Sequence, residues 1–178
     1  MSEEKNQLSV LQEVYSPGQV ARVVDEVGVR KAALPVFQTY TLAILAGAFI
    51  AVGSMFFTLV MTGDSGLFGL HRLAGGMAFS LGLVLVVIGG AELFTGNNLI
   101  VMAWADRKIG TMGLLRNWIV VYLGNFVGAL GCAVLVKYAG VMALSGGAVG
   151  ETAVAIAKAK ISLPYLEAFV RGLLCNAL

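Results

Sequence analysis

The chain has 178 residues, of which 58% are hydrophobic and 12% are charged, and its mean hydropathy is +0.87. An average soluble domain has about 25% charged residues, so this composition excludes an ordinary soluble protein and indicates burial in a lipid bilayer. The formal net charge is only +2 and the Lys and Arg residues are scattered, which argues against a nucleic-acid-binding surface.

An amphipathic helix is predicted to begin at Ser16, after a polar segment at residues 1–15. Ser16 suits the N-cap, Pro17 the first helical position and Gln19 the capping-box position. One face of the helix carries four valines: Val20, Val23, Val24 and Val27. The pattern is typical of a helix on the membrane surface or beneath the spans, and equally of a solvated helix with a small partner face. No apolar run precedes residue 36, so no cleavable signal peptide is expected.

The first span is predicted at residues 36–61, which contain no charged residue and are long enough to cross a bilayer with some tilt. Within it, Ala43, Gly47 and Ala51 recur every four residues. Small residues at this spacing form a smooth stripe that allows another helix to approach closely. A polar turn at residues 63–66 is expected to end the span.

Residues 73–105 form an apolar block with an interruption at residues 89–98. One continuous helix over the block would be about 50 Å long, which is too long for a hydrocarbon core of about 30 Å yet too short for two spans and a turn. The interruption combines glycines with Glu92, the only carboxylate in the block. We therefore predict a broken span. Non-helical backbone at membrane depth is tolerated only where it is buried in protein or lines an aqueous cavity, so the break indicates a pore or a binding site.

Glu92 itself has two interpretations. An ionisable group at membrane depth is a functional candidate by default. Its carboxylate could also cap the half-helix that restarts near Asn97, where it would satisfy free backbone N–H groups and the helix dipole. Of the two, we favour the cap.

A third span is predicted at residues 118–136. It contains a second stripe of small residues: Gly124, Gly128 and Cys132. Residues 137–162 are more polar and are expected to form a connection. Pro164 then opens a fourth apolar segment that continues to the last residue. About fifteen residues are too few to complete a span, so we expect the chain to be the first part of a longer protein.

The distribution of basic residues predicts the orientation of the spans. Lys and Arg are concentrated before the first span and at residues 106–116, which places both segments in the cytoplasm. Lys137, Lys158 and Lys160 would then face outside, against the usual bias. A basic vestibule for anions and a mild exception to a statistical rule explain this equally well.

Three ordered motifs resemble the formate/nitrite transporter family, and the resemblance covers the chain from about Ser16 to its end. The matching segments are residues 79–83 with 90–96 for the first signature, 117–118 with 122–129 for the third span, and 171–176 for the opening of the second signature. The resemblance implies an all-α integral membrane protein with an aquaporin-like helical bundle. Each six-span protomer of such a homopentamer contains two inverted repeats and its own pore.

By this resemblance, the chain would supply the first inverted repeat, whose second span is broken, and the start of the fourth span. Residues 1–35 would form a cytoplasmic N-terminal segment with the amphipathic helix, and residues 36–178 would form the membrane channel domain. The implied location is the inner (plasma) membrane, with several spans and a cytoplasmic N-terminus.

The family's site residues carry over position by position. Its apolar pore constrictions correspond to Phe79, Leu83, Leu93 and Phe94. Its polar pore and substrate-binding positions correspond to Thr95, Asn176 and Lys160. Residues of the break itself correspond to Gly90, Glu92, Gly96 and Asn97.

The resemblance also implies a role for each polar position. Thr95 matches a threonine that hydrogen-bonds a pore histidine on the fifth span, which lies beyond the last residue of this chain. Lys160 matches a vestibule lysine that attracts anions, although from its residue type alone it would be an exposed loop lysine. Asn176 matches a pore-lining donor. His71 does not match the pore histidine and is expected to be an external loop residue without a role.

The expected cargo is a small monovalent anion, formate first, that passes as the anion or as the weak acid. Nitrite or hydrosulfide is the alternative within the family, and acetate and lactate are further candidate cargoes. A channel for neutral solutes is less favoured because the Asn-Pro-Ala pair of aquaporins is absent. No cofactor, metal site or enzymatic activity is expected, since one histidine and two cysteines in separate segments cannot form an ordinary zinc or di-iron site.

Overall fold

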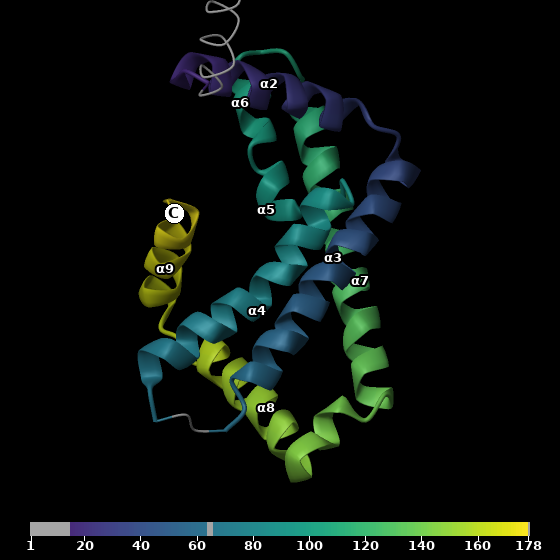
Figure 1. Ribbon diagram of the computed structural model, residues 1–178. Coiled ribbons are helices and arrows are strands. Elements are labelled where there is room, and N and C mark those ends of the chain that lie inside the picture. Colours follow the sequence, from purple (N-terminus) through teal and green to yellow (C-terminus); the bar gives the residue numbers. More distant parts are fainter. Residues whose placement is uncertain (1–14, 64–65, 178) are drawn as a thin grey trace, which may run out of the picture. The chain divides into compact units, whose positions relative to one another are not determined.

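The computed structural model describes residues 15–63 and 66–177, and within these ranges the regular structure is entirely helical. In chain order the helices are α2 (Pro17–Ala33), α3 (Val36–Val60), α4 (Phe68–Ile88), α5 (Phe94–Asn97), α6 (Ile100–Ala105), α7 (Thr111–Tyr138), the 3₁₀ helix η1 (Val141–Gly147), α8 (Ala148–Ile161) and α9 (Tyr165–Ala177) (Figure 1). The expected polar segment at residues 1–15 lies, apart from Tyr15, outside the described part. The predicted first span and the predicted break in the second are confirmed.

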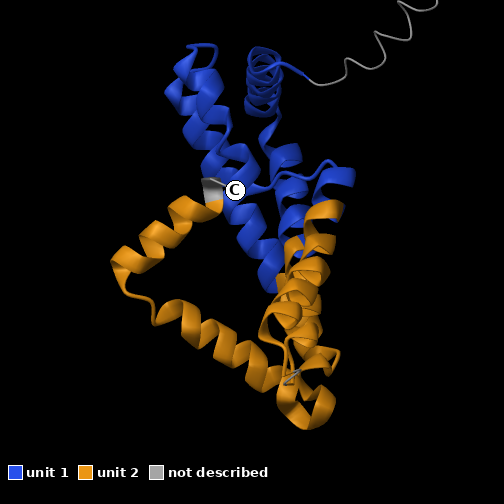
Figure 2. Cartoon of the chain, turned by 60° about the vertical axis from the view of Figure 1, so that its left-hand side comes forward, with its two compact units in different colours: residues 1–49, 85–130 blue, residues 50–84, 131–178 orange. Residues whose placement is uncertain are grey.

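The helices divide into two compact units (Figure 2). Unit 1 comprises Met1–Phe49 and Leu85–Leu130, and unit 2 comprises Ile50–Val84 and Gly131–Leu178. Helices α3, α4 and α7 each contribute residues to both units. Each unit is described below by itself.

Helix α2 begins with the expected capping box. The Ser16 side chain accepts a hydrogen bond from the backbone N–H of Gln19 at 3.4 Å, and the Ser16 backbone N–H donates to Gln19 Oε1 at 2.8 Å. These two bonds satisfy backbone donors that a helix start leaves free. The prediction of the helix start at Ser16 is therefore confirmed.

The buried face of α2 differs from the valine face that the sequence indicates. Asp25, Gly28 and Ala32 are the buried residues, and α2 packs with this face on α6. A side-chain carbon at Gly28 would lie 3.2 Å from the Cβ of Ala103, so the two backbones are close. The four valines lie beside this contact and are exposed or half-buried. Close approach of two helices needs small residues more than bulky apolar ones, which explains the choice of face.

In unit 1, α3 and α7 meet through the predicted small residues. A Cβ added at Gly128 would lie 1.9 Å from the backbone oxygen of Ile44, and one at Gly47 would lie 2.1 Å from that of Asn125. Neither space can hold a methyl group, so only glycine permits this contact. Ala43 faces Gly124 and is completely buried. The part of each stripe that lies in unit 1 is thus confirmed as a helix contact.

Helix α7 begins earlier than predicted, at Thr111 rather than near residue 118. Its 28 residues make it about 42 Å long, so it exceeds the hydrocarbon core. Arg116 lies in its early turns and donates to the backbone oxygens of Ala32 and Leu34. These carbonyls lie at the C-terminal end of α2, where free carbonyl groups and the helix dipole favour a cation. Figure 1 shows α2 across the ends of α6 and α7.

The expected polar connection at residues 137–162 is wrong in part, because α8 occupies Ala148–Ile161. The chain turns sharply first, with positive φ at Gly140, Ser145, Gly146 and Gly147. The alanine-rich sequence that follows then favours a helix, with Glu151 in its first turn and two lysines in its last turn.

The prediction that His71 lies in an external loop is wrong. This residue lies in α4, and its Nε2 is 2.6 Å from the backbone oxygen of Val60.

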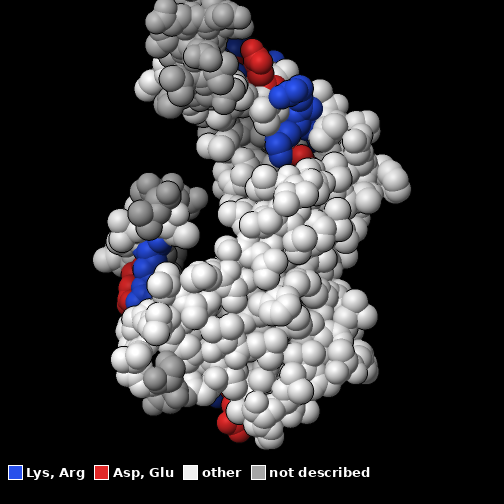
Figure 3. All heavy atoms as spheres, viewed as in Figure 1, with Lys and Arg blue, Asp and Glu red and all other residues white. Residues whose placement is uncertain are grey.

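Four stretches of the described residues are long and apolar enough to cross a membrane: Val36–Val60, Phe68–Ile88, Thr111–Tyr138 and Val141–Ile161. The last stretch is not one helix, since Leu144, Ser145 and Gly146 have non-helical backbone angles. Its α-helical part, α8, has 14 residues and is about 21 Å long, shorter than a hydrocarbon core of about 30 Å. On the face shown in Figure 3, the charged residues of unit 1 gather at α2, and its remaining surface carries almost no charge. The fold is that of an all-α membrane protein, as expected.

Candidate functional site

The second span breaks at Gly90, where the backbone turns into a left-handed conformation. Helix α4 ends with the N–H of Ala91 donating to the oxygen of Val86 at 3.0 Å and the N–H of Gly90 donating to that of Val87 at 3.2 Å. This pair of bonds is a Schellman motif, and its left-handed residue is Gly90 with φ of 58°. The motif satisfies the last carbonyls of α4 and redirects the chain before α5 begins.

Replacing Gly90 by alanine is expected to lower the free energy of unfolding by about 1–2 kcal/mol, because an L residue is strained in the left-handed region. The measurement is denaturant or thermal unfolding of the full gene product in detergent. Gly96→Ala is the matched control: it adds the same methyl group within α5, where nothing lies within 4 Å of the new carbon and φ is ordinary. Equal losses in the two variants would contradict the assignment of strain to Gly90.

Glu92 lies directly after the turn and is almost completely buried, with 4% of its surface exposed. Its carboxylate accepts hydrogen bonds from Lys31 Nζ at 2.8 Å and from Asn97 Nδ2 at 2.6 Å. The favoured interpretation of Glu92 as a helix cap is wrong. The N-cap residues of α5 and α6 are Leu93 and Leu99, and no side chain caps either helix. Burying a carboxylate costs less free energy when a cation compensates its charge than when it accepts one backbone N–H bond, and Lys31 of α2 is that cation.

Asn97 extends this cluster and is fully buried. Its Oδ1 accepts from Lys31 Nζ at 2.9 Å, and its Nδ2 donates to Asn117 Oδ1 at 2.9 Å as well as to Glu92. Its backbone oxygen accepts from the indole Nε1 of Trp118 at 3.0 Å. Asn117, in turn, donates to the backbone oxygen of Lys31 at 3.3 Å. Every polar atom of Asn97 outside the helix ladder therefore has a partner, which is the condition for a stable buried polar group.

Asn125 of α7 holds the irregular backbone of the break. Its Oδ1 accepts from the N–H of Phe94 at 2.9 Å. Its Nδ2 donates to the backbone oxygens of Ala43 at 2.8 Å and Glu92 at 2.9 Å. One amide group thus connects α3, the break and α7. The N–H of Phe94 and the backbone oxygen of Glu92 lie outside the hydrogen-bond ladder of any helix, so at membrane depth each would otherwise cost several kcal/mol.

The predicted pore residues of the break project beside this cluster. The ring of Phe94 packs edge-on against two aromatic side chains of α7, with centroid distances of 6.5 Å to Trp118 and 5.5 Å to Tyr122. Leu93 and Phe94 are half-buried, whereas Thr95 and Gly96 are exposed within the described part of the chain. The structure therefore brings Leu93, Phe94 and Thr95 together with the break.

The other two predicted constriction residues, Phe79 and Leu83, belong to unit 2 and lie on α4. Gly53 of α3 lets α4 approach here, because a Cβ on it would lie 2.7 Å from the backbone oxygen of Phe79. Phe79 also lines a cleft of 510 Å³ in unit 2, together with Lys160. Leu83 is exposed and does not line this cleft.

The cleft of unit 2, named here the basic cleft, is lined by residues of α3, α4, α8 and α9 and of the turn between α8 and α9. Its lining consists of Ser54, Phe57, Thr58, Arg72, Gly76, Phe79, Ile156, Ala159, Lys160, Leu163 and Arg171. Three of these residues are cations, and no acidic residue is among the described residues that line it. The third predicted polar position, Asn176, lies on α9, and its side chain is outside the part of the chain that the structure describes.

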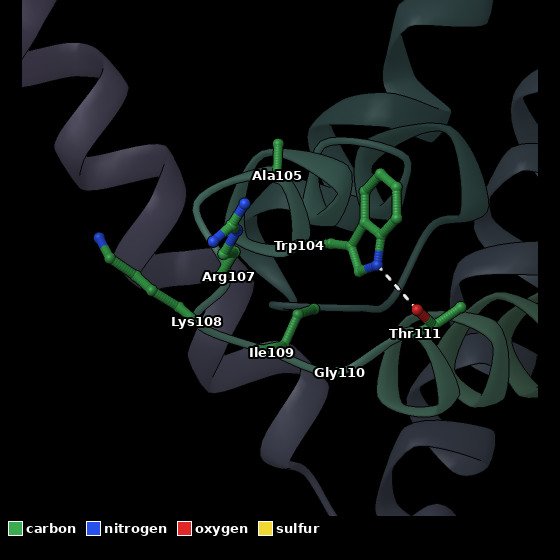
Figure 4. A pocket seen from close by; sticks show the side chains of 7 residues that line it. All are labelled: Trp104, Ala105, Arg107, Lys108, Ile109, Gly110 and Thr111. Carbon is green, nitrogen blue, oxygen red and sulfur yellow. Dashed lines mark hydrogen bonds between the residues drawn. The ribbon is translucent and has the colours of Figure 1, made fainter.

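A second charged region lies in unit 1 at the loop between α6 and α7, beside a pocket of 450 Å³ (Figure 4). Trp104 Nε1 donates to the hydroxyl of Thr111 at 3.0 Å and closes this loop. Lys108 points away from Trp104 and forms an ion pair with the buried Asp25 of α2. Arg107 adopts a left-handed conformation with φ of 59°. The ion pair attaches the loop to α2.

The formate/nitrite transporter family profile matches residues 18–178 of this sequence. The chain belongs to this family. The formate channel FocA of Haemophilus influenzae is 39% identical over 177 residues, which cover 99% of this chain and 62% of that protein. The formate channel FocA of Escherichia coli K12 is 40% identical over 161 residues, which cover 90% of this chain and 56% of that protein.

Among solved structures, a pentameric formate channel with formate bound is similar to this chain at a TM-score of 0.71 and 38% sequence identity. The match covers 79% of this chain and 56% of the channel protomer. The chain therefore spans about 60% of the length of the relatives that it matches. As a member of the formate/nitrite transporter family, it is a membrane protein with several spans.

Sequence reasoning missed four residues that the structure places at these sites: Lys31, Asn117, Asn125 and Arg72. A signal exists for two of them, since an asparagine inside an apolar span must find a hydrogen-bond partner. Lys31 has no such signal, because lysine at the end of an amphipathic helix is ordinary at a protein surface. Its partner could be recognised only once Glu92 was known to be buried.

Proposed function

We propose that the full gene product is a membrane channel for small monovalent anions, with formate as its main cargo. The observation that carries the proposal is the break after Gly90 in an otherwise helical second span, held open by a buried polar cluster. A span is interrupted at membrane depth where a polar route passes. The names of the FocA relatives, which are formate channels, support formate as the cargo.

The proposed pore uses apolar side chains as constrictions and polar groups between them. Phe79, Leu83, Leu93 and Phe94 are the constriction residues, as the family motifs imply. A dry constriction opposes a charged ion strongly and a small neutral acid weakly, since burying a charge costs far more than burying a hydrogen-bonding group. Formate would therefore pass as the anion where polar groups replace its water, or as the weak acid. Thr95, exposed beside Phe94, and Asn176 are the proposed polar contacts.

The remaining features of the proposal concern assembly and location. A homopentamer with one pore in each protomer is supported by the pentameric formate channel that shares this fold. The distribution of Lys and Arg supports a cytoplasmic N-terminal segment at residues 1–35, and channel-forming residues 36–178 in the inner (plasma) membrane. We propose a channel and not an enzyme, because the passage of formate through a pore makes and breaks no covalent bond.

The test is uptake of radiolabelled formate by liposomes that contain the full gene product. We expect uptake at least tenfold above that of empty liposomes, together with a single-channel or counterflow signal that saturates with formate concentration. Uptake of nitrite and of hydrosulfide by the same liposomes is measured for comparison, because these anions are the alternative cargoes within the family. Faster uptake of either one would reassign the cargo, and water or glycerol flux without anion flux would overturn the channel assignment.

A further inference from the structure

The basic cleft of unit 2 contains a guanidinium group, that of Arg72, which has no hydrogen-bond partner among the described residues. Arg72 lies near the start of α4, and its Cζ is 5.3 Å from the centroid of the Phe68 ring. A guanidinium group that packs over an aromatic face keeps its N–H groups in its own plane, pointing away from the ring. No hydrogen bond or ion pair from Arg72 to another residue is found within the described part of the chain. The contact with Phe68 restrains this side chain, and its N–H groups have no hydrogen-bond partner among residues 15–63 and 66–177.

The other two cations of the basic cleft differ from Arg72. The guanidinium of Arg171 is engaged by Glu167 one turn earlier on α9, which neutralises part of its charge. Lys160, in the last turn of α8, carries a point charge on a flexible side chain without a fork. All three raise the positive potential in the cleft. Among the described residues, Arg72 is the guanidinium of the cleft that has no acidic partner, so both of its parallel N–H donors are available to a planar anion.

The hydroxyl groups of the cleft do not compete for this role. Ser54 Oγ donates to the backbone oxygen of Ile50 at 2.9 Å, and Thr58 Oγ1 donates to that of Ser54 at 2.8 Å. Their protons are thus used within α3, and the rest of the lining is apolar or glycine. The donors available to an anion in the cleft are the cationic side chains.

We propose that Arg72 is the recognition residue of an anion site in the basic cleft, and that this site selects planar anions with two oxygens before they reach Phe79. A carboxylate matches the guanidinium fork with two parallel hydrogen bonds, whereas an anion with a single acceptor atom must share that atom between the two donors at poorer angles. Lys160 and Arg171 increase the local anion concentration but do not read the shape of the anion. This inference rests on the proposed function, since it assigns the entry step of the same pore.

The experiment measures the concentration dependence of uptake of radiolabelled formate and of hydrosulfide by liposomes containing the full gene product. In Arg72→Gln the formate KM is expected to rise about three- to tenfold at low salt, with little change in kcat, as one nearby charge and its fork are lost. In Arg72→Lys, which keeps the charge, the formate KM is still expected to rise at least threefold while the hydrosulfide KM stays unchanged. Lys158→Gln is the matched control, because it removes a lysine from α8 that lies outside the cleft.

The outcomes separate this inference from the proposed function. Formate KM values in Arg72→Gln and Lys158→Gln that agree within twofold would overturn the site. An Arg72→Lys variant with normal KM for both anions would overturn selection by shape. Line broadening of ¹³C-formate by the detergent-solubilised protein reports binding without transport, and its loss in Arg72→Gln is expected. If the unchanged protein transports no formate, the proposed function fails. If the unchanged protein also fails to broaden the ¹³C-formate line, the anion site is overturned as well, whatever the transport result.

Discussion

Replacing Gly128 by alanine is expected to destabilise the protein by about 3 kcal/mol and to abolish transport. The added methyl carbon would lie 1.9 Å from the backbone oxygen of Ile44 and 2.9 Å from the backbone nitrogen of Ala48. Backbone atoms of a helix cannot rotate away as a side chain can, so α3 and α7 must separate. The separation would also pull Asn125 of α7 away from the break. Thermal unfolding in detergent and formate uptake in liposomes measure the two effects.

Gly131→Ala provides the control on the same helix. A carbon added at Gly131 has nothing within 4 Å, and alanine is a better helix former than glycine. We expect this variant to be as stable as the unchanged protein, or more stable, and to transport normally. The close α3–α7 contact would be disproved by a Gly128→Ala protein that unfolds at the same temperature as Gly131→Ala.

Replacing Lys31 by methionine is expected to destabilise the protein by about 2–4 kcal/mol, because the Glu92 carboxylate then stays buried without its cation. The side chain of Glu92 is 5% exposed and that of Lys31 is 27% exposed, so water compensates only part of the loss. Asn97 Oδ1 loses a donor in the same variant. Unfolding of the full gene product in detergent measures the change, and limited proteolysis near α2 reports release of that helix.

The double variant Lys31→Met with Glu92→Gln tests the reason for this loss. Without a carboxylate there is no buried charge left uncompensated, so the double variant is expected to recover at least half of the stability that Lys31→Met loses. Arg22→Met is a matched control, since it removes a cation from an exposed position of the same helix. If the double variant were as unstable as the sum of its single changes, charge compensation would not be the role of Lys31.

The interruption of the second span could be predicted from the sequence because several local signals agree there. Two adjacent glycines end a helix, and a block of this length fits neither one span nor two. The glycine stripes also contain the information needed to place α3 against α7. Such features depend on backbone geometry, which residue type and spacing constrain directly.

The interpretations that were wrong depend on contacts between distant parts of the chain. Glu92 was interpreted as a cap because its carboxylate could satisfy the free backbone N–H groups and the dipole of the half-helix that follows it, while its cationic partner is Lys31 on another helix. The valine face of α2 looked like the packing face because apolar character was taken as the signal. The contact with α6 instead follows from the small residues Gly28 and Ala103, whose effect is steric.

The candidate site was predictable only in part, for a related physical reason. The motif residues of the break could be named from the family resemblance, but not the groups that satisfy their backbone. Asn125 serves three backbone partners at once, and this depends on the crossing of α3 and α7. Arg72 was missed because its significance depends on the packing of Phe68 and on the approach of α8 and α9 to α4.

The attachment of α2 to later parts of the chain has a consequence for biosynthesis. Helix α2 is the first of the described helices to leave the ribosome, yet Lys31 bonds to residues 61 and 66 positions later, and Arg116 binds the end of α2 across 84 positions. Long sequence separation delays such contacts until the later segments have emerged. Lys31 therefore lacks these two partners until Glu92 and Asn97 have been synthesised, so α2 can dock fully only after the second span has been made.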